Sequence, residues 1–196
     1  AEPGVELSGG STTVFNAGPN AFGMPLANIS RSNRRAHVVG NSFFNKNWVF
    51  SPSSTTARDG LGPLFHARSC SSCHVKDGRG APTNDSSTSI GLLFRLSVPG
   101  KASGDPVLGV QLATKAAPGV EPEGTVNVRY EEKEVGFDNL KTASLRKPQY
   151  ELITSNHYGD PHAKIQCGPR IAQQLVGVGL LEAVPDTAIL AKADPN

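Results

Sequence analysis

The residues of this chain with the most specific chemistry are two cysteines and a histidine, in the segment Cys70-Ser71-Ser72-Cys73-His74. Two thiols one helical turn apart can add across the two vinyl groups on one edge of a porphyrin, and the next imidazole can bind the iron. With three Cys and five His in 196 residues, this motif arises by chance in about one sequence in a thousand. The spacing predicts one covalent haem c, held by Cys70 and Cys73, with His74 as the proximal iron ligand.

Two other uses of a CxxC pair compete with haem attachment. A thioredoxin-like redox pair sits at a strand-to-helix turn, whereas the upstream segment 60–65 has the pattern of a helix start. A structural zinc site needs a second pair of ligands, and Cys167 and His162 lie far along the chain without a paired spacing. Cys167 is better explained as a small buried residue. These comparisons favour haem.

The sixth ligand of the iron decides what such a haem does. Met or His there gives a low-spin electron carrier, whereas an open position permits peroxide chemistry. Met24 lies in an irregular Gly/Pro loop, and His157 and His162 lie in a turn-rich segment, where ligands to a distant site commonly arise. His37 and His66 are less favoured, because His37 precedes an apolar helix face and His66 shares the predicted helix of the thiols. The sequence leaves these candidates and an open iron as alternatives.

Arginine and aromatic side chains are candidates for the surroundings of the haem. Guanidinium groups pair well with carboxylates such as haem propionates. Arg79 is the preferred partner, because it lies in the loop that follows His74. The further candidates are Arg68, Arg95 and Arg170. Three aromatic residues are expected to line the haem pocket or to pack in the core, namely Trp48, Phe65 and Phe94.

The helices that position these residues can be predicted from hydrophobic spacing. Residues 1–30 form an irregular arm rich in Gly, Pro, Asn and Ser. Ser30 or Ser32 is expected to cap a core helix. Its apolar face would comprise Val39, Phe43, Phe44 and Trp48. A second helix is predicted from residue 61 or 63 to residue 73, with a proline in its first turn.

The second half of the chain has strand-like and then helical patterns. Strands are predicted at 90–98, 125–130 and 150–153, separated by Gly/Pro/Asp-rich turns. A helix is predicted from residue 169, and its apolar face would comprise Ile171, Leu175, Val178 and Leu181. A short last helix follows at 186–192. We therefore expect a mainly α, cytochrome c-like helical haem domain at 31–196, with a small antiparallel β insertion at about 88–153 and much irregular structure.

Composition excludes several classes of partner and indicates a compartment. The 19 Lys and Arg nearly balance the 17 Asp and Glu, so we expect neither a nucleic-acid nor a polyanionic partner. The sequence contains no apolar run long enough to predict a membrane span. The start at Ala1-Glu2-Pro3 suits a mature end after a signal peptide. Covalent haem attachment outside the cytoplasmic membrane predicts a periplasmic or other extracytoplasmic location in a bacterium.

Three sequence blocks around these motifs resemble a known family. They are residues 39–44 with Trp48, residues 58–65 continuing through 73–80, and residues 169–171 continuing through 179–185. Together they resemble the bacterial di-haem oxidoreductases, a peroxidase-like family also labelled thiol oxidoreductases and distantly related to the di-haem cytochrome c peroxidases. The thiol label does not suit this motif, because thioether formation consumes both thiols. The resemblance extends from about residue 20 to the end of the sequence.

The chain departs from that family in two respects. Family members carry a second CxxCH in a C-terminal half, whereas this sequence has one CxxCH. The sequence also ends where family members continue. In addition, His66 stands where they usually have Asn. The resemblance therefore implies the N-terminal, single-haem half of a di-haem oxidoreductase. We expect it to transfer electrons with a redox partner protein or a second haem domain. The alternative is a peroxidase-type enzyme that reduces hydrogen peroxide at an open haem face; no catalytic acid or base is identifiable from the sequence.

Overall fold

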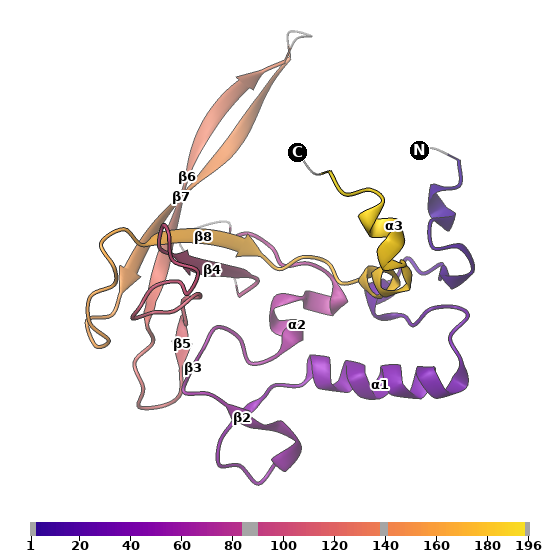
Figure 1. Cartoon of the computed structure of the whole chain (residues 1–196), viewed down its shortest axis with the longest axis horizontal. Coiled ribbons are helices and arrows are strands. Elements are labelled where there is room, and N and C mark those ends of the chain that lie inside the picture. Colours follow the sequence, from indigo (N-terminus) through magenta and orange to yellow (C-terminus); the bar gives the residue numbers. More distant parts are fainter. Residues whose placement is uncertain (1–2, 84–89, 138–140, 195–196) are drawn as a thin grey trace.

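The structure, a computed structural model, describes residues 3–83, 90–137 and 141–194. Its helices are α1 (Arg31–Asn45), α2 (Cys70–Cys73) and α3 (Asp186–Leu190), with 3-10 helices at Val5–Leu7, Gly10–Thr12, Ala21–Gly23, Thr56–Arg58, Val75–Asp77 and Val178–Ala183. Its strands are β1 (Val49–Phe50), β2 (Asp59–Leu61), β3 (Leu64–Phe65), β4 (Leu92–Ser97), β5 (Lys115–Ala116), β6 (Gly124–Gly136), β7 (Thr142–Thr154) and β8 (Gln166–Ile171). Figure 1 shows α1, α2 and α3 on one side of the molecule and the long β6–β7 hairpin projecting from the other.

The strands pair in four two-stranded sheets. β6 and β7 are antiparallel over thirteen residues each, from Gly124 opposite Thr154 to Gly136 opposite Thr142. β4 and β8 are antiparallel over their whole length. Of two shorter pairs, β1–β2 lies within the region before the CxxCH motif, and β3–β5 joins that region to the segment at Lys115 and Ala116. The β4–β8 pair matters most for the site, because the chain leaves β8 directly toward α2.

The apolar core lies among the strands. Alternate residues of β4 point to one side, as the pleat of a strand requires, and meet two alternate residues of β6. The buried cluster consists of Leu92, Phe94, Leu96, Leu108, Leu112, Val126 and Val128. The ring of Phe94 is fully buried and packs edge-on against Tyr150 of β7. The helices contribute nothing to this cluster, so the body has a β core with an attached helical part.

The prediction of a mainly α domain is wrong. Only 25% of the structure is helical, whereas 28% is strand. The strands predicted at 125–130 and 150–153 were too short, because polar residues in the outer hairpin hid the alternation, and β8 was not predicted as a strand. β6 and β7 continue past the apolar positions through Glu131, Glu132 and Arg146, where cross-strand pairs replace burial.

The first predicted helix is confirmed, with its N-cap, but its role in a core is not. Ser30 caps α1, since its Oγ accepts a hydrogen bond from the Asn33 N–H. The helix contains no buried residue, and it ends before Trp48, whose N–H instead donates to the Arg68 carbonyl. Of the four apolar residues expected on its core face, Phe44 faces the cavity described below, and Val39 and Phe43 are exposed.

Two other predicted helices are wrong over most of their length. In the segment 61–73 only α2 is α-helical, and β2 and β3 precede it. The segment after residue 169 begins in β8, where the ladder to β4 overrides the helical spacing. Gly177, at φ +78°, then interrupts the chain in a left-handed conformation that suits glycine. A short last helix is confirmed as α3.

Residues 88–89 and 138–140 of the expected β insertion lie outside the described residues. Within the described part of the chain, no helix combines the length and apolar character that crossing a bilayer requires.

Candidate functional site

The two cysteines of the motif lie one turn apart on α2. Ser69 caps this helix, because its Oγ accepts a hydrogen bond from the Ser72 N–H at 3.2 Å. Cys70 is exposed. The Cys73 thiol is half-buried and donates to the Ile90 carbonyl at 3.1 Å. The His74 N–H closes the turn onto the Cys70 carbonyl at 3.0 Å, so the imidazole follows directly on the turn that carries both thiols.

The His74 imidazole is held by a backbone carbonyl from a distant part of the chain. Its Nδ1 lies 2.7 Å from the Gln173 carbonyl oxygen. A carbonyl only accepts, so this contact assigns the proton to Nδ1 and leaves the Nε2 lone pair for a metal. Among the described residues Nε2 has no hydrogen-bond partner. This is the usual arrangement of a histidine ligand, whose second nitrogen donates to an outer-shell acceptor.

The sheet delivers the Gln173 carbonyl to this position. Gln173 follows β8 by two residues. On the way, Ala172 donates to the Gly91 carbonyl at 2.9 Å and accepts from the Gly80 N–H at 2.7 Å. These bonds clamp the strand exit between the start of β4 and the loop after His74. The β core therefore fixes the orientation of the histidine.

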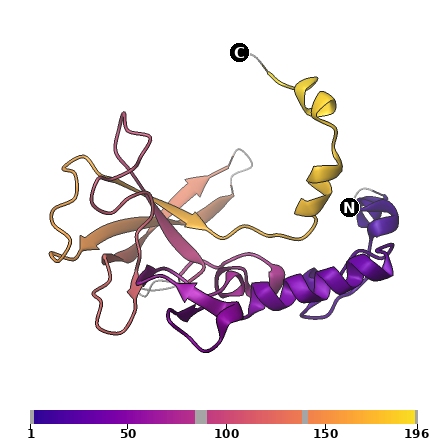
Figure 2. The ribbon, with the colours of Figure 1, turned by 60° about the horizontal axis from the view of Figure 1, so that its bottom comes forward.

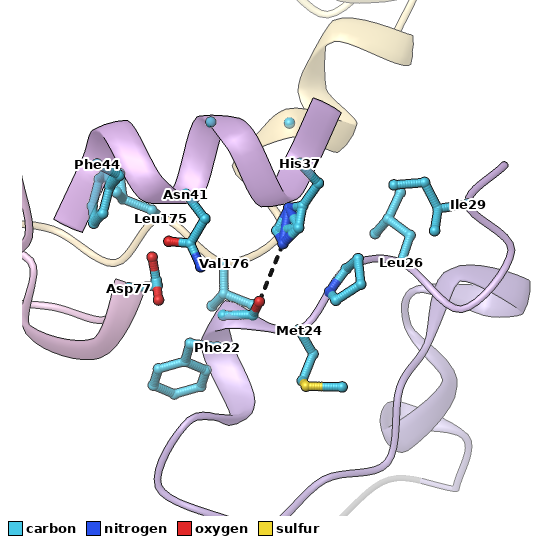
Figure 3. Close-up of a pocket in the computed structure, with 15 residues that line it drawn as sticks. Phe22, Met24, Leu26, Ile29, His37, Asn41, Phe44, Asp77, Leu175 and Val176 are labelled. Carbon is cyan, nitrogen blue, oxygen red and sulfur yellow. Dashed lines mark hydrogen bonds between the residues drawn. The ribbon is translucent and has the colours of Figure 1, made fainter. Parts of the chain in front are cut away.

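An apolar cavity of about 480 Å³ lies beside the motif. Figure 3 shows α1 on one side of it and the segment around Met24 on the other. Its apolar lining comprises Phe22, Leu26, Ile29, Phe44, Leu175 and Val176. The ring of Phe44 also packs on His74, with 6.2 Å between ring centroids. Phe44 thus lies between this cavity and the imidazole, whereas Cys70, Cys73 and His74 are not among the residues that line the cavity.

The residues present fit a covalent haem. The donor set comprises two thiols one turn apart and an imidazole with a free Nε2, which is the set that haem c needs. Phe22 and Val176 border the cavity yet remain 52% and 41% exposed, so these apolar surfaces are available to a macrocycle. Cys70 and Cys73 would hold the vinyl edge and His74 the iron.

Comparison with known proteins gives a family match for the first part of the chain. Residues 3–90 match the sequence model of the family described as "Di-haem oxidoreductase, putative peroxidase". Over these residues the chain is similar to that family. This match includes α1, the Met24 segment and the CxxCH motif, and it confirms the resemblance for those blocks. The block at 169–185 lies beyond the matched residues. No curated protein matches the chain, and no solved structure matches it.

The family match agrees with the exclusion of the alternative CxxC chemistries. Within the described residues, no group of three or more His, Cys, Asp or Glu is placed to hold a metal ion, so the zinc interpretation has no ligand set there. The helix start predicted at 60–65 is wrong, because β3 precedes α2, so a strand does lie before the CxxC pair as in a thioredoxin-like site. However, burial raises the pKa of the Cys73 thiol, whereas reactive dithiols need a lowered pKa.

The distal-ligand candidates occupy different parts of the molecule. Met24 lines the cavity beside the motif. His157 and His162 do not border it. His157 packs against Tyr158, and the His162 N–H donates to buried Asp105 at 2.8 Å. Of these three residues, only Met24 lines the cavity. Phe44, which packs on His74, lines it as well.

His66 is a structural residue. It is 7% exposed, with Nδ1 2.9 Å from Thr114 Oγ1 and Nε2 2.9 Å from the Ile90 carbonyl. Burial lowers its pKa, which favours the neutral ring. Both nitrogens are in use, and the same Ile90 carbonyl accepts from the Cys73 thiol. His66 thus ties α2 to the start of β4.

The arginine and aromatic candidates are mostly remote from the cavity. Arg79 is exposed in the loop after His74. The Arg68 guanidinium bonds to the Trp48 carbonyl at 3.2 Å and 3.3 Å and lies over Phe50. Arg95 and Arg170 are exposed on β4 and β8. Phe94 belongs to the β core and Phe65 packs on Phe50. Neither they nor Trp48 line the cavity.

Three polar residues at the cavity differ from the sequence-based predictions. Asn41 and Asp77 were not identified as site residues, and His37 was given another role. Asn41 and Asp77 both line it. His37, considered only as a weak iron ligand, lies 3.2 Å through Nε2 from the Gly23 carbonyl, as the dashed line in Figure 3 shows. The spacing of His37, Asn41 and Phe44 at i, i+4 and i+7 is the signal that could have found this face.

Proposed function

We propose that this chain is a c-type cytochrome domain that binds one covalent haem and transfers electrons, as the N-terminal part of a di-haem oxidoreductase. The observation that carries the proposal is the hydrogen bond from His74 Nδ1 to the Gln173 carbonyl, beside two thiols and an apolar cavity. It presents the imidazole in the tautomer that binds iron. The family match supports haem as the cofactor.

A bound haem would supply a one-electron iron couple, and the chain's own groups would set its surroundings. With haem in place, the apolar walls of the cavity would exclude water from it, which would lower the local dielectric and thereby influence the potential. The Gln173 carbonyl raises the basicity of the His74 ring by accepting its Nδ1 proton. Exposed Cys70 marks the edge of the cofactor that would face solvent and a redox partner.

We assign Met24 as the sixth ligand in this proposal. Its side chain lines the cavity, and it is the only sulfur there. The neighbouring Gly23 carbonyl is bound by His37 of α1, which anchors the segment that carries Met24. A thioether ligand raises the reduction potential of a haem and suits an electron carrier.

Attachment chemistry supports the proposed location and partners. Thioether formation takes place outside the cytoplasmic membrane, so a protein with this motif works in the periplasm or at the cell exterior. Its electrons would pass to a redox partner protein or to a second haem domain. The proposal requires no nucleic acid and no membrane span.

Optical spectra of the ferric and ferrous protein test the electron-carrier proposal. The expected spectrum is low-spin in both states and unchanged by carbon monoxide or cyanide. Met24→Ala should convert it to high-spin and allow carbon monoxide to bind. Leu26→Ala is the matched control, because Leu26 lines the same cavity without a ligating atom. A high-spin wild-type spectrum contradicts the carrier proposal, and a low-spin Met24→Ala variant contradicts the ligand assignment.

A second candidate function, peroxide reduction, is favoured by one observation. The carboxylate of Asp77 and the amide of Asn41 lie together at the cavity, as Figure 3 shows. A carboxylate there could transfer a proton to a bound oxygen species. This function requires an open iron and two electrons per peroxide. It predicts peroxidase activity in the wild type that Asp77→Asn reduces at least tenfold, whereas the carrier proposal predicts no activity in either protein.

A further inference from the structure

The face of α1 that points away from the haem cavity has an unusual composition. The cavity side of the helix presents His37, Asn41 and Phe44. The opposite side borders a separate hollow whose lining is Arg31, Arg34, Arg35, Val38 and Val39. We call these five residues the arginine–valine face. Figure 2 shows α1 along the lower border of the molecule.

The charges of this face have no partner within the part of the chain that the structure describes. The sequence of α1 contains three arginines and no Asp or Glu. Among the described residues, the side chains of Arg31, Arg34 and Arg35 make no salt bridge or hydrogen bond. The ion pairs there lie on the β6–β7 hairpin instead, between Arg129 and Glu151 and between Arg146 and Glu132. Three adjacent cations without a counter-charge among residues 3–83, 90–137 and 141–194 create a local positive potential, although the whole chain is near neutral.

Apolar side chains interrupt this positive surface. Val38 and Val39 are 64% and 56% exposed, next to Phe43 at 46%. A second hollow continues from the valines toward Phe43, Lys46 and Ala57. Burial of such side chains on a partner is favourable, whereas in the free chain they remain in water. The face thus combines long-range attraction with a short apolar contact, as protein interfaces do.

We propose that the arginine–valine face docks an acidic protein surface that presents carboxylates around one or two apolar side chains. The unpaired arginines specify the negative charge, and the valine hollow specifies the apolar centre. Because this face lies on the far side of α1 from the cavity, the partner would dock without covering the haem site. A lipid surface fits less well, because two hollows suit inserted side chains and the face lacks the Trp or Leu residues of interfacial helices.

The test uses a synthetic amphipathic helical peptide of glutamate and leucine, labelled for fluorescence anisotropy and titrated with the full chain. Its control replaces every glutamate by glutamine. Two double variants change the face. Arg34→Gln with Arg35→Gln removes charge from side chains that make no salt bridge or hydrogen bond among the described residues, and Val38→Ser with Val39→Ser removes the apolar centre. Lys133→Gln with Lys147→Gln is the matched control on exposed positions of β6 and β7. Circular dichroism establishes that each variant is folded.

The expected result is salt-sensitive binding of the glutamate peptide, weakened about fivefold or more in each face variant. The arginine variant loses exposed ion pairs, each of which contributes up to about 1 kcal/mol, and the valine variant loses apolar burial. The lysine control should bind as the wild type does. Unchanged binding in both face variants overturns the proposal, and so does equal binding of the glutamine peptide. Binding to phosphatidylglycerol vesicles but not to the glutamate peptide would also overturn it and identify a membrane surface instead.

Discussion

Phe94→Ala should destabilise the whole chain, including the part that carries the haem motif. Phe94 is 0% exposed at the centre of the β core, and its ring packs edge-on against Tyr150 with 5.9 Å between centroids. Removing a fully buried Phe side chain costs about 3–5 kcal/mol of unfolding free energy, since both transfer energy and a cavity contribute. In a domain of this size, that loss lowers the melting temperature by about 6–20 °C.

The assay is urea unfolding followed by far-ultraviolet circular dichroism. Phe15→Ala is the matched control, because the Phe15 side chain is 74% exposed, and its loss should change the free energy by less than about 0.5 kcal/mol. Phe94→Ala should also affect Gln173, whose position depends on the β4–β8 pair. A weakened core should therefore also loosen the hold on the His74 ring. A Phe94→Ala cost below about 1 kcal/mol, equal to that of Phe15→Ala, would refute the assignment of the core.

Three further changes test the surroundings of the site. Although burial opposes ionisation of Asp105, hydrogen bonds from the N–H groups of Leu108, His162 and Val107 hold its pKa below its ordinary value. Stability should therefore decline as pH falls below about 4. Thermal unfolding across pH should show a smaller decline in Asp105→Asn. Burial lowers the pKa of His66, so the unfolded chain binds a proton at a higher pH than the folded chain does. Acidification below about pH 6.5 should therefore reduce stability, and His66→Gln should remove that part of the dependence of stability on pH. Gly80→Ala should lower the unfolding free energy by about 1–3 kcal/mol, because the new Cβ would stand 2.5 Å from the Gly91 carbonyl oxygen; an unchanged urea midpoint would contradict the close approach.

Part of the fold was predictable because local signals and tertiary contacts agree there. Ser30 as N-cap and the helical spacing after it predicted α1. The apolar alternation predicted β4 and the inner ends of β6 and β7. The mainly α class failed where long-range pairing decides the structure. The segment at Ile171 has a helical spacing, yet the six-residue ladder to β4 makes it a strand.

The site divides in the same way. Cys70, Cys73 and His74 are contiguous, so their spacing alone predicted a donor set. The Gln173 carbonyl, by contrast, is a backbone group 99 residues from His74, and no side-chain identity signals it. Asp77 and Asn41 become neighbours of Met24 because α1 contacts α2 and the 3-10 helix Ala21–Gly23 contacts the 3-10 helix Val75–Asp77. Such residues need the three-dimensional arrangement before chemistry can be assigned to them.

The most direct test of the central claim is the intact mass of the denatured chain, produced in a bacterium with the c-type cytochrome maturation machinery. The account predicts one haem that remains attached through denaturation. The intact mass should therefore exceed that of the polypeptide by one haem, and the chain should give a haem-stained band on a denaturing gel. Cys70→Ala with Cys73→Ala should lose it, whereas Cys167→Ala should keep it. A wild-type chain without attached haem, or a stain that persists in the Cys70/Cys73 variant, would contradict the account.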